Sequence, residues 1–227
     1  TALAEMVPYL EKAEVVELKK GEQRKGESIA VIAPGTGLGQ GYLVDVGGNF
    51  IVKASEGGHA TFAPVNEEEL KLYHWLLKTH KDVSAENICS GPGLTLLYNY
   101  YIEKGDVLPA EWVRREAESK DDLAPVIVKG AVAADPCPLC TKVINRYLRL
   151  LGSESANLAL KLYARGGVFI GGGVILHLLD RISLQPFIEA FQQKGKMSHL
   201  LSEIPVYIIT KKHANLHGAM RYARSKF

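Results

Sequence analysis

Residues 29–41 read Ile-Ala-Val-Ile-Ala-Pro-Gly-Thr-Gly-Leu-Gly-Gln-Gly, an apolar run that passes directly into a glycine-rich loop. The apolar run belongs to the first of three predicted strands, at 28–33, 41–46 and 49–54. Gly47-Gly48 separates the last two strands and indicates a hairpin turn, because glycine adopts positive φ without a steric penalty. The three strands therefore predict an antiparallel meander.

The rest of the chain alternates predicted helices with short apolar strands. A helix is expected from Asn66, with three glutamates in its first turn, where the helix dipole favours acids. The longest predicted helix runs from Pro136 to Arg165, strands are expected at 168–170 and 204–210, and a helix at 216–224 closes the chain. Antiparallel strands followed by alternating helices and strands predict an α/β fold with helices packed on a mixed sheet.

Apolar periodicity also predicts which helical residues are buried. For the helix after Asn66, the expected buried residues are Leu70, Tyr73, Leu76 and Leu77. For the long helix, they are Leu139, Val143, Ile144, Tyr147, Leu151, Leu158 and Leu162, a stripe that could lie across the sheet.

The loop Gly35-Thr36-Gly37 is a candidate phosphate site. Backbone amides in a tight glycine turn can point together at an anion, and the missing side chains let phosphate oxygens approach. A tight β-turn without a ligand explains the same residues. The loop is neither a Walker A motif, since no Gly-Lys-Ser/Thr follows, nor a dinucleotide fingerprint, since a strand rather than a helix is predicted next.

Gly171-Gly172-Gly173 follows the predicted strand 168–170. Ligands gather at strand ends in α/β folds, so close approach of a nucleotide would explain three glycines. Tight packing of a helix against a strand would explain them equally well.

Glu56-Gly57-Gly58-His59 is a candidate site for hydroxyl groups. A carboxylate accepts hydrogen bonds from neighbouring hydroxyls, an imidazole donates or accepts, and the paired glycines would bend the backbone so that both side chains face one point. The alternative is a solvated loop with an incidental histidine. Glu86 has no local signal and by itself is a surface acid.

Composition excludes several classes of function. The net charge is +2 and no basic stripe interleaved with aromatic residues is present, so nucleic acid is not an expected partner. No apolar run reaches the roughly 18 residues that a membrane span needs. Cys137 and Cys140 form one Cys-x-x-Cys at a predicted helix start, which can lower the pKa of a thiol and give weak redox sensitivity. A structural zinc site needs about four ligands, and no second cysteine pair is present, so no metal site is expected. Three cysteines fit a reducing cytoplasm better than a disulfide framework.

Together these segments resemble the bacterial-type glucokinase family, within the actin-like sugar-kinase superfamily. The matching stretches are 34–39 (PGTGLG), 56–59 (EGGH) continuing to 62–64 (FAP), 84–86 (SAE), 90–94 (SGPGL) and 167–173 (GVFIGGG), with 205–207 (PVY) and 218–219 (GA) fitting as well. The resemblance runs from Thr1 to about Arg224, and it is specific because several motifs agree in order and spacing.

The resemblance implies an actin-like (ribonuclease H-like) ATPase domain that transfers a phosphoryl group from ATP, with Mg²⁺, to the 6-hydroxyl of glucose. It implies that Glu56, His59 and Glu86 bind the sugar, that Gly35, Thr36 and Gly37 lie against the phosphates, and that Gly171 and Gly172 border the adenosine. It also suggests a homodimer. A non-catalytic sugar-binding or regulatory module, or a kinase for another hexose or another donor such as polyphosphate, remains an alternative.

Two family elements are not found in these residues: an Asp-x-Gly-Gly-Thr phosphate loop and an Asn-Asp pair whose Asp is the general base. The resemblance places that pair immediately before Thr1-Ala2. General-base catalysis contributes about 10²–10⁴-fold, so the chain alone is expected to be inactive. The implied organisation is 1–12 as the end of a small N-terminal domain, 13–203 as the large sugar- and nucleotide-binding domain, and 204–227 as a strand and helix returning toward the small domain.

Overall fold

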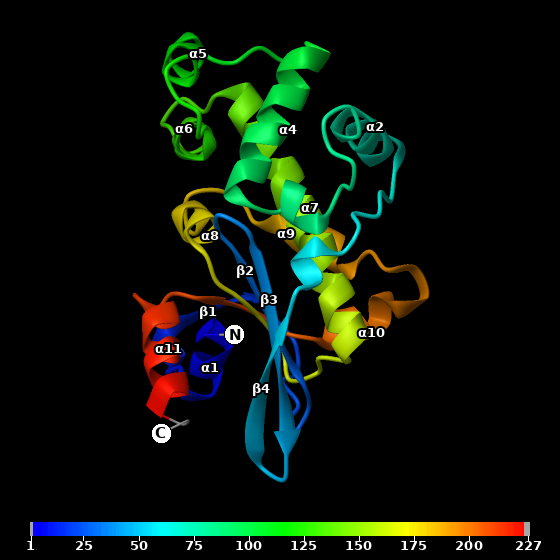
Figure 1. The fold of residues 1–227 in the computed structure, drawn as a ribbon, viewed down its shortest axis with the longest axis vertical. Coiled ribbons are helices and arrows are strands. Elements are labelled where there is room, and N and C mark those ends of the chain that lie inside the picture. Colours follow the sequence, from blue (N-terminus) through cyan, green and yellow to red (C-terminus); the bar gives the residue numbers. More distant parts are fainter. Residues whose placement is uncertain (1, 225–227) are drawn as a thin grey trace.

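A six-stranded mixed sheet forms the centre of the fold, in the strand order β1-β6-β5-β2-β3-β4 (Figure 1). The computed structural model describes residues 2–224, so Thr1 and the last three residues of the predicted 204–227 segment lie outside the described residues. The strands are β1 (Val15–Lys19), β2 (Ile29–Pro34), β3 (Leu38–Val46), β4 (Asn49–Ser55), β5 (Val168–Ile170) and β6 (Val206–Ile209). Strand β5 runs parallel to both β2 and β6, whereas the pairs β1–β6, β2–β3 and β3–β4 are antiparallel. The predicted α/β class, mixed sheet and meander are confirmed.

The hairpin between β3 and β4 closes at the predicted glycine pair. Gly47 and Gly48 have φ values of 64° and 89°, and the Gly48 amide donates to Asp45 Oδ1 at 2.7 Å. Strand β3 begins at Leu38, three residues earlier than predicted, because Gly39 and Gln40 continue the ladder opposite Ala33 and Ile32. The predicted glycine-rich loop is thereby reduced to a turn at residues 35–37.

Side chains of β2 alternate between two apolar layers. Ala30 and Ile32 belong to the larger core beneath the helices, and Ile29 and Val31 belong to a smaller core on the opposite face. The smaller core is covered by α1 (Ala2–Met6) and α11 (Ala214–Arg224), which lie side by side in Figure 1. These two helices approach so closely that a Cβ on Gly218 would lie 1.7 Å from the Ala2 carbonyl oxygen.

The remaining helices build the larger core around α7 (Pro138–Leu162), the longest of them, which packs on strand β2 and on three of the other helices, α4 (Gly91–Lys104), α6 (Ala124–Ala131) and α9 (Gln185–Gln192). The rest are α2 (Glu67–Leu76), α3 (Ala85–Ile88), α5 (Glu111–Ala117), α8 (Gly173–Leu178) and α10 (Ser198–Glu203). The predicted apolar stripe of α7 is buried except at Leu162, which is partly exposed. None of the helices formed by residues 2–224 combines the length and apolar character that a bilayer span requires.

The buried face of α2 differs from the prediction. Of the predicted residues, Leu76 is buried and Tyr73 packs against the core, but Leu70 and Leu77 are 40% and 41% exposed, and Glu69 and Leu72 are buried instead. Glu69 points inward: its carboxylate faces Arg146 Nη1 of α7 at 3.4 Å and accepts the Val65 amide at 3.0 Å. Apolar periodicity could not predict this, since the buried position carries a charge.

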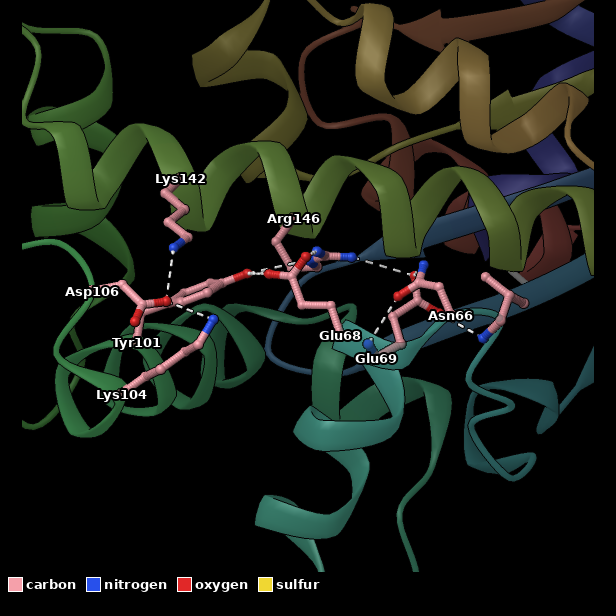
Figure 2. Close-up of polar contacts among 9 residues, drawn as sticks. Asn66, Glu68, Glu69, Tyr101, Lys104, Asp106, Lys142 and Arg146 are labelled. Atoms are coloured by element: carbon pink, nitrogen blue, oxygen red, sulfur yellow. Dashed lines mark hydrogen bonds and ion pairs between the residues drawn. The ribbon is translucent and has the colours of Figure 1, made fainter.

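Figure 2 shows how this polar cluster joins three helices. Arg146 of α7 also pairs with Glu68 of α2 and donates to the Tyr101 hydroxyl of α4 at 3.3 Å, and that hydroxyl donates to Glu68 Oε1 at 2.7 Å. Burial by itself raises the pKa of Glu68, but the Tyr101 hydroxyl and the Arg146 guanidinium outweigh it and leave that pKa below its usual value. The cluster thereby ties α2 to α4 and α7.

Candidate functional site

Glu56, His59 and Glu86 meet at one place on the surface. His59 lies between the two carboxylates, with Nε2 at 3.9 Å from Glu56 Oε2 and Nδ1 at 3.9 Å from Glu86 Oε1. The Glu56 and His59 side chains are largely exposed, whereas that of Glu86 is 32% exposed. The structure thus brings together the three residues that the resemblance assigned to sugar binding.

A short antiparallel pairing brings Glu86 to this place. The Phe62 amide donates to the Val83 carbonyl at 2.8 Å, and the Ala85 amide donates to the Ala60 carbonyl at 2.9 Å. His59 directly precedes one of these segments, and Glu86 directly follows the other. This long-range pairing has no local sequence signal, which is why Glu86 by itself resembled an ordinary surface acid.

Glu86 is also fixed to the glycine-rich turn. Its Oε2 accepts the Leu38 amide at 2.8 Å, and a Cβ on Gly37 would lie only 2.5 Å from that same oxygen. Gly37 therefore leaves room for the carboxylate, and the carboxylate holds the first residue of β3.

Gly57 and Gly58 lie in a tight 3-10 turn, Gly57–His59, that brings the Glu56 and His59 side chains together, as the sequence predicted. Neither glycine has positive φ, so close packing is what requires them to lack a side chain. A Cβ on Gly57 would lie 2.1 Å from Gln40 Oε1, and one on Gly58 would lie 2.2 Å from the Leu38 carbonyl oxygen. The turn that carries Glu56 and His59 rests directly on β3.

Residues 35–37 form a tight turn with open space above Gly35. The Gly35 amide donates to the Gly37 carbonyl at 2.8 Å, and the Gly35 carbonyl accepts the Gly91 amide at 2.7 Å, which ties the turn to the start of α4. A Cβ on Gly35 would meet no atom within 4 Å, so no contact among the described residues requires glycine there. Exposed Thr36 stands at the tip. The arrangement leaves space in which an anion can approach the backbone.

Two cavities meet at this turn. A cavity of about 420 Å³ is bordered by the 35–41 segment, Ser55, Glu56, Glu86 and residues of α1, and a larger one of about 830 Å³ extends to the start of α4 and to α8. Gly35, Thr36 and Glu86 line both. A group bound at the turn would therefore contact occupants of both cavities.

The three consecutive glycines after β5 have separate roles. A Cβ on Gly171 would lie 2.3 Å from Leu3 Cδ2, and one on Gly172, at φ 112°, would lie 2.0 Å from the Pro34 carbonyl oxygen. Gly173 meets nothing within 4 Å and lines the larger cavity. Packing explains the first two glycines, and the third borders open space.

Polar residues that the sequence did not single out complete the walls. Gln40 and Ser55 line the smaller cavity, and Ser90, Thr95 and Asp122 line the larger one. Gln40 and Ser55 are direct partners in the β3–β4 ladder. Each lies one residue outside a predicted strand, 41–46 or 49–54, so strand alternation did not mark the pair, and only the three-dimensional packing shows that both line a cavity.

The Cys-x-x-Cys is part of the core. Cys137 and Cys140 are both free and buried, and Cys137 Sγ accepts the Ala110 amide at 3.4 Å. Burial raises the pKa of Cys140, which is the opposite of the lowering that a helix start can cause, so nothing here favours an activated thiol. Within residues 2–224, no three His, Cys, Asp or Glu side chains are grouped so that they could hold a metal ion.

Comparison with protein families matches residues 1–226 to the glucokinase family model. A glucokinase of Colwellia psychrerythraea is 35% identical over 227 residues, which are all of this chain and 67% of the relative. A glucokinase of Chromobacterium violaceum is 38% identical over 223 residues, covering 96% of this chain and 60% of the relative. The chain thus spans about two thirds of the length of these relatives.

Solved structures give the same fold. A glucokinase from an Antarctic psychrotroph matches with a TM-score of 0.80 and 32% identity over 99% of this chain and 66% of that one. A Balamuthia mandrillaris glucokinase, solved with glucose, matches with a TM-score of 0.70 and 28% identity over 88% of this chain and 55% of that one. A Streptomyces griseus glucokinase of the ROK family, solved with glucose and AMPPNP, is 23% identical with a TM-score of 0.58 over 90% of this chain and 62% of that one, which shows the fold alone. The fold is that of the actin-like sugar kinases.

Proposed function

Because the chain belongs to the glucokinase family, we propose that its protein transfers the terminal phosphoryl group of ATP to the 6-hydroxyl of glucose. The observation that carries the proposal is the junction at Gly35, Thr36 and Glu86, where a smaller cavity beside two carboxylates and an imidazole meets a larger one. In this reaction the sugar oxygen forms a bond to phosphorus, the bond to ADP breaks, and the hydroxyl proton passes to a base.

Glucose is proposed to bind in the smaller cavity. The Glu56 and Glu86 carboxylates accept hydrogen bonds from sugar hydroxyls, and the His59 imidazole between them donates or accepts. The Leu38 amide donates to Glu86 Oε2 and so fixes the position of this carboxylate. The other oxygen, Oε1, then faces His59. The Balamuthia relative solved with glucose supports this choice of ligand.

ATP is proposed to bind in the larger cavity with its phosphates against Gly35, Thr36 and Gly37. The open space above Gly35 fits a phosphate, since a side chain there would occupy it. Gly171 and Gly172 are proposed to border the adenosine: Gly171 packs on Leu3, Gly172 lies close to Pro34, and the next residue, Gly173, lines the cavity. Mg²⁺ would supply charge neutralisation between the phosphates, taking its oxygen ligands chiefly from them.

We propose that the general base is an aspartate in the third of the family's length that these 227 residues do not span. The proposed organisation is 1–12 as the end of a small domain, 13–203 as the large domain and 204–227 as the returning strand and helix; the packing of α1 on α11 is consistent with a junction at this face. A homodimer is proposed from the family resemblance. A cytoplasmic location is proposed because all three cysteines are free and buried.

A coupled assay for glucose 6-phosphate tests the proposal. The protein produced from the whole gene is expected to turn over glucose with ATP, and the 227-residue chain is expected to bind glucose with negligible turnover. Normal turnover by the 227-residue chain would contradict the proposed base. If the whole protein phosphorylates another hexose but not glucose, or uses polyphosphate but not ATP, the proposed substrate or donor is wrong. If the whole protein binds glucose without turnover, the non-catalytic alternative holds.

A further inference from the structure

Gln40 is a buried amide in the wall of the smaller cavity. It lies on β3, is 5% exposed, and its Nε2 donates to Glu154 Oε1 of α7 at 2.8 Å. Neither residue belongs to the group proposed to bind glucose or ATP.

The partner carboxylate fixes which way the amide points. An ionised carboxylate only accepts hydrogen bonds, so Gln40 must turn its NH₂ group toward Glu154 and its carbonyl oxygen away. That oxygen faces Gly57, where a Cβ would lie 2.1 Å from it. The Gln40 carbonyl therefore forms part of the floor beneath the turn that carries Glu56 and His59.

Glu154 is held in its turn by a chain of polar contacts. Asn157 Nδ2 donates to Glu154 Oε2 at 3.1 Å, and Lys194 Nζ donates to Asn157 Oδ1 at 2.8 Å and to Ser153 Oγ at 2.8 Å. The carboxylate is thereby anchored to α7 and, through Asn157, to Lys194 in the segment after α9.

We propose that Gln40 and Glu154 are a positioning pair that sets the height of the Glu56–His59 turn above β3 and so aligns its side chains with the sugar. The proposal rests on the proposed function for the identity of the ligand. Gly58 rests on the backbone carbonyl of Leu38, whose amide is held by Glu86, whereas Gly57 rests on a side-chain oxygen of Gln40 whose position depends on the hydrogen bond to Glu154. Losing that bond moves one end of the turn.

Exchanging the two groups separates positioning from general stability. Gln40→Glu sets two carboxylates against each other and is expected to weaken glucose binding about tenfold in calorimetry, a coupling typical of residues in direct contact. In the double variant Gln40→Glu/Glu154→Gln, the amide at position 154 donates to the carboxylate at position 40, and affinity should return to within about twofold of the wild type. Glu154→Gln alone keeps an acceptor oxygen and should stay within about threefold. Glu189→Gln, which alters a partly exposed carboxylate paired with Arg149, is the matched control and should leave glucose affinity unchanged.

Two further readouts make the outcome decisive. Affinity for ADP should be unchanged in every variant, and amide exchange at residues 56–60 should be faster in Gln40→Glu and return to normal in the double variant. The proposed positioning role would be contradicted if the double variant bound glucose as weakly as Gln40→Glu does. It would also be contradicted if Gln40→Glu lost affinity for ADP as much as for glucose. If the wild-type chain does not bind glucose, the proposed function fails. Amide exchange at residues 56–60 in the variants then still tests whether Gln40 and Glu154 position the turn.

Discussion

Gly172→Ala is expected to destabilise the fold strongly, although it adds one methyl group. Gly172 has φ 112° and ψ 147°, a backbone region that costs other residues about 1–3 kcal/mol. Its Cβ would also lie 2.0 Å from the Pro34 carbonyl oxygen, and forcing a group into a packed site costs about 1–3 kcal/mol more. The total of roughly 2–6 kcal/mol is a large part of the roughly 5–15 kcal/mol that stabilises a typical domain.

Gly173→Ala is the matched control, one residue along the chain. A Cβ at Gly173 meets no atom within 4 Å and the residue begins α8, so stability should be unchanged or should rise by up to about 1 kcal/mol. Because Gly173 lines the larger cavity, this variant should instead lower nucleotide affinity. Denaturant unfolding compares the two variants, and calorimetry with ADP measures binding. Equal stability of the two variants would refute the assignment of Gly172 to packing and Gly173 to the cavity wall.

Two other predictions concern the supports of the site. The pKa of Glu68 is lower in the folded chain than its usual 4.5, so the unfolded chain binds more protons in acid. The ionised Glu68 carboxylate therefore stabilises the fold above about pH 4.5, and this contribution to the unfolding free energy is lost as the pH falls through the pKa of the folded chain. Glu68→Gln should therefore lose less unfolding free energy than the wild type between about pH 7 and about pH 3, and parallel pH profiles would contradict the role given to Arg146 and Tyr101. Gly58→Ala places a methyl 2.2 Å from the Leu38 carbonyl oxygen, so it should cost about 1–3 kcal/mol and weaken glucose binding; unchanged thermal unfolding and affinity would show that the turn does not rest on β3.

The sheet could be predicted because its signals are local. Apolar runs, the glycine pair at the hairpin and the buried run 168–170 each specify a strand without reference to distant residues. The short helices α3, α8, α9 and α10 were not predicted, since helices of this length are stabilised mainly by tertiary packing.

Site residues that lie close together in the sequence could be predicted, and those brought together by long-range contacts could not. Glu56 and His59 share one short motif, whereas Glu86 reaches them through the pairing of Ala60 with Ala85 and was found only by family resemblance. Gln40 became visible only in three dimensions, because its role depends on Glu154, 114 positions away in the sequence.

The inward turn of Glu69 limits the prediction of α2 for the same reason. Its partner Arg146 lies on a helix 77 positions later, and periodicity within one helix carries no information about that pairing. The role of each glycine likewise depends on which atoms lie next to it in the fold, as Gly57 beside Gln40 and Gly172 beside Pro34 show.

Titration of the 227-residue chain with glucose in a calorimeter tests the central claim most directly, with Glu56→Gln measured alongside. The Glu56→Gln side chain keeps its shape but loses the charge that strengthens acceptance from hydroxyls, so the account predicts glucose binding by the wild type and roughly tenfold or greater weakening in the variant. Absence of glucose binding by the wild type, or equal affinity of the two proteins, would contradict the assignment of this cavity to the sugar.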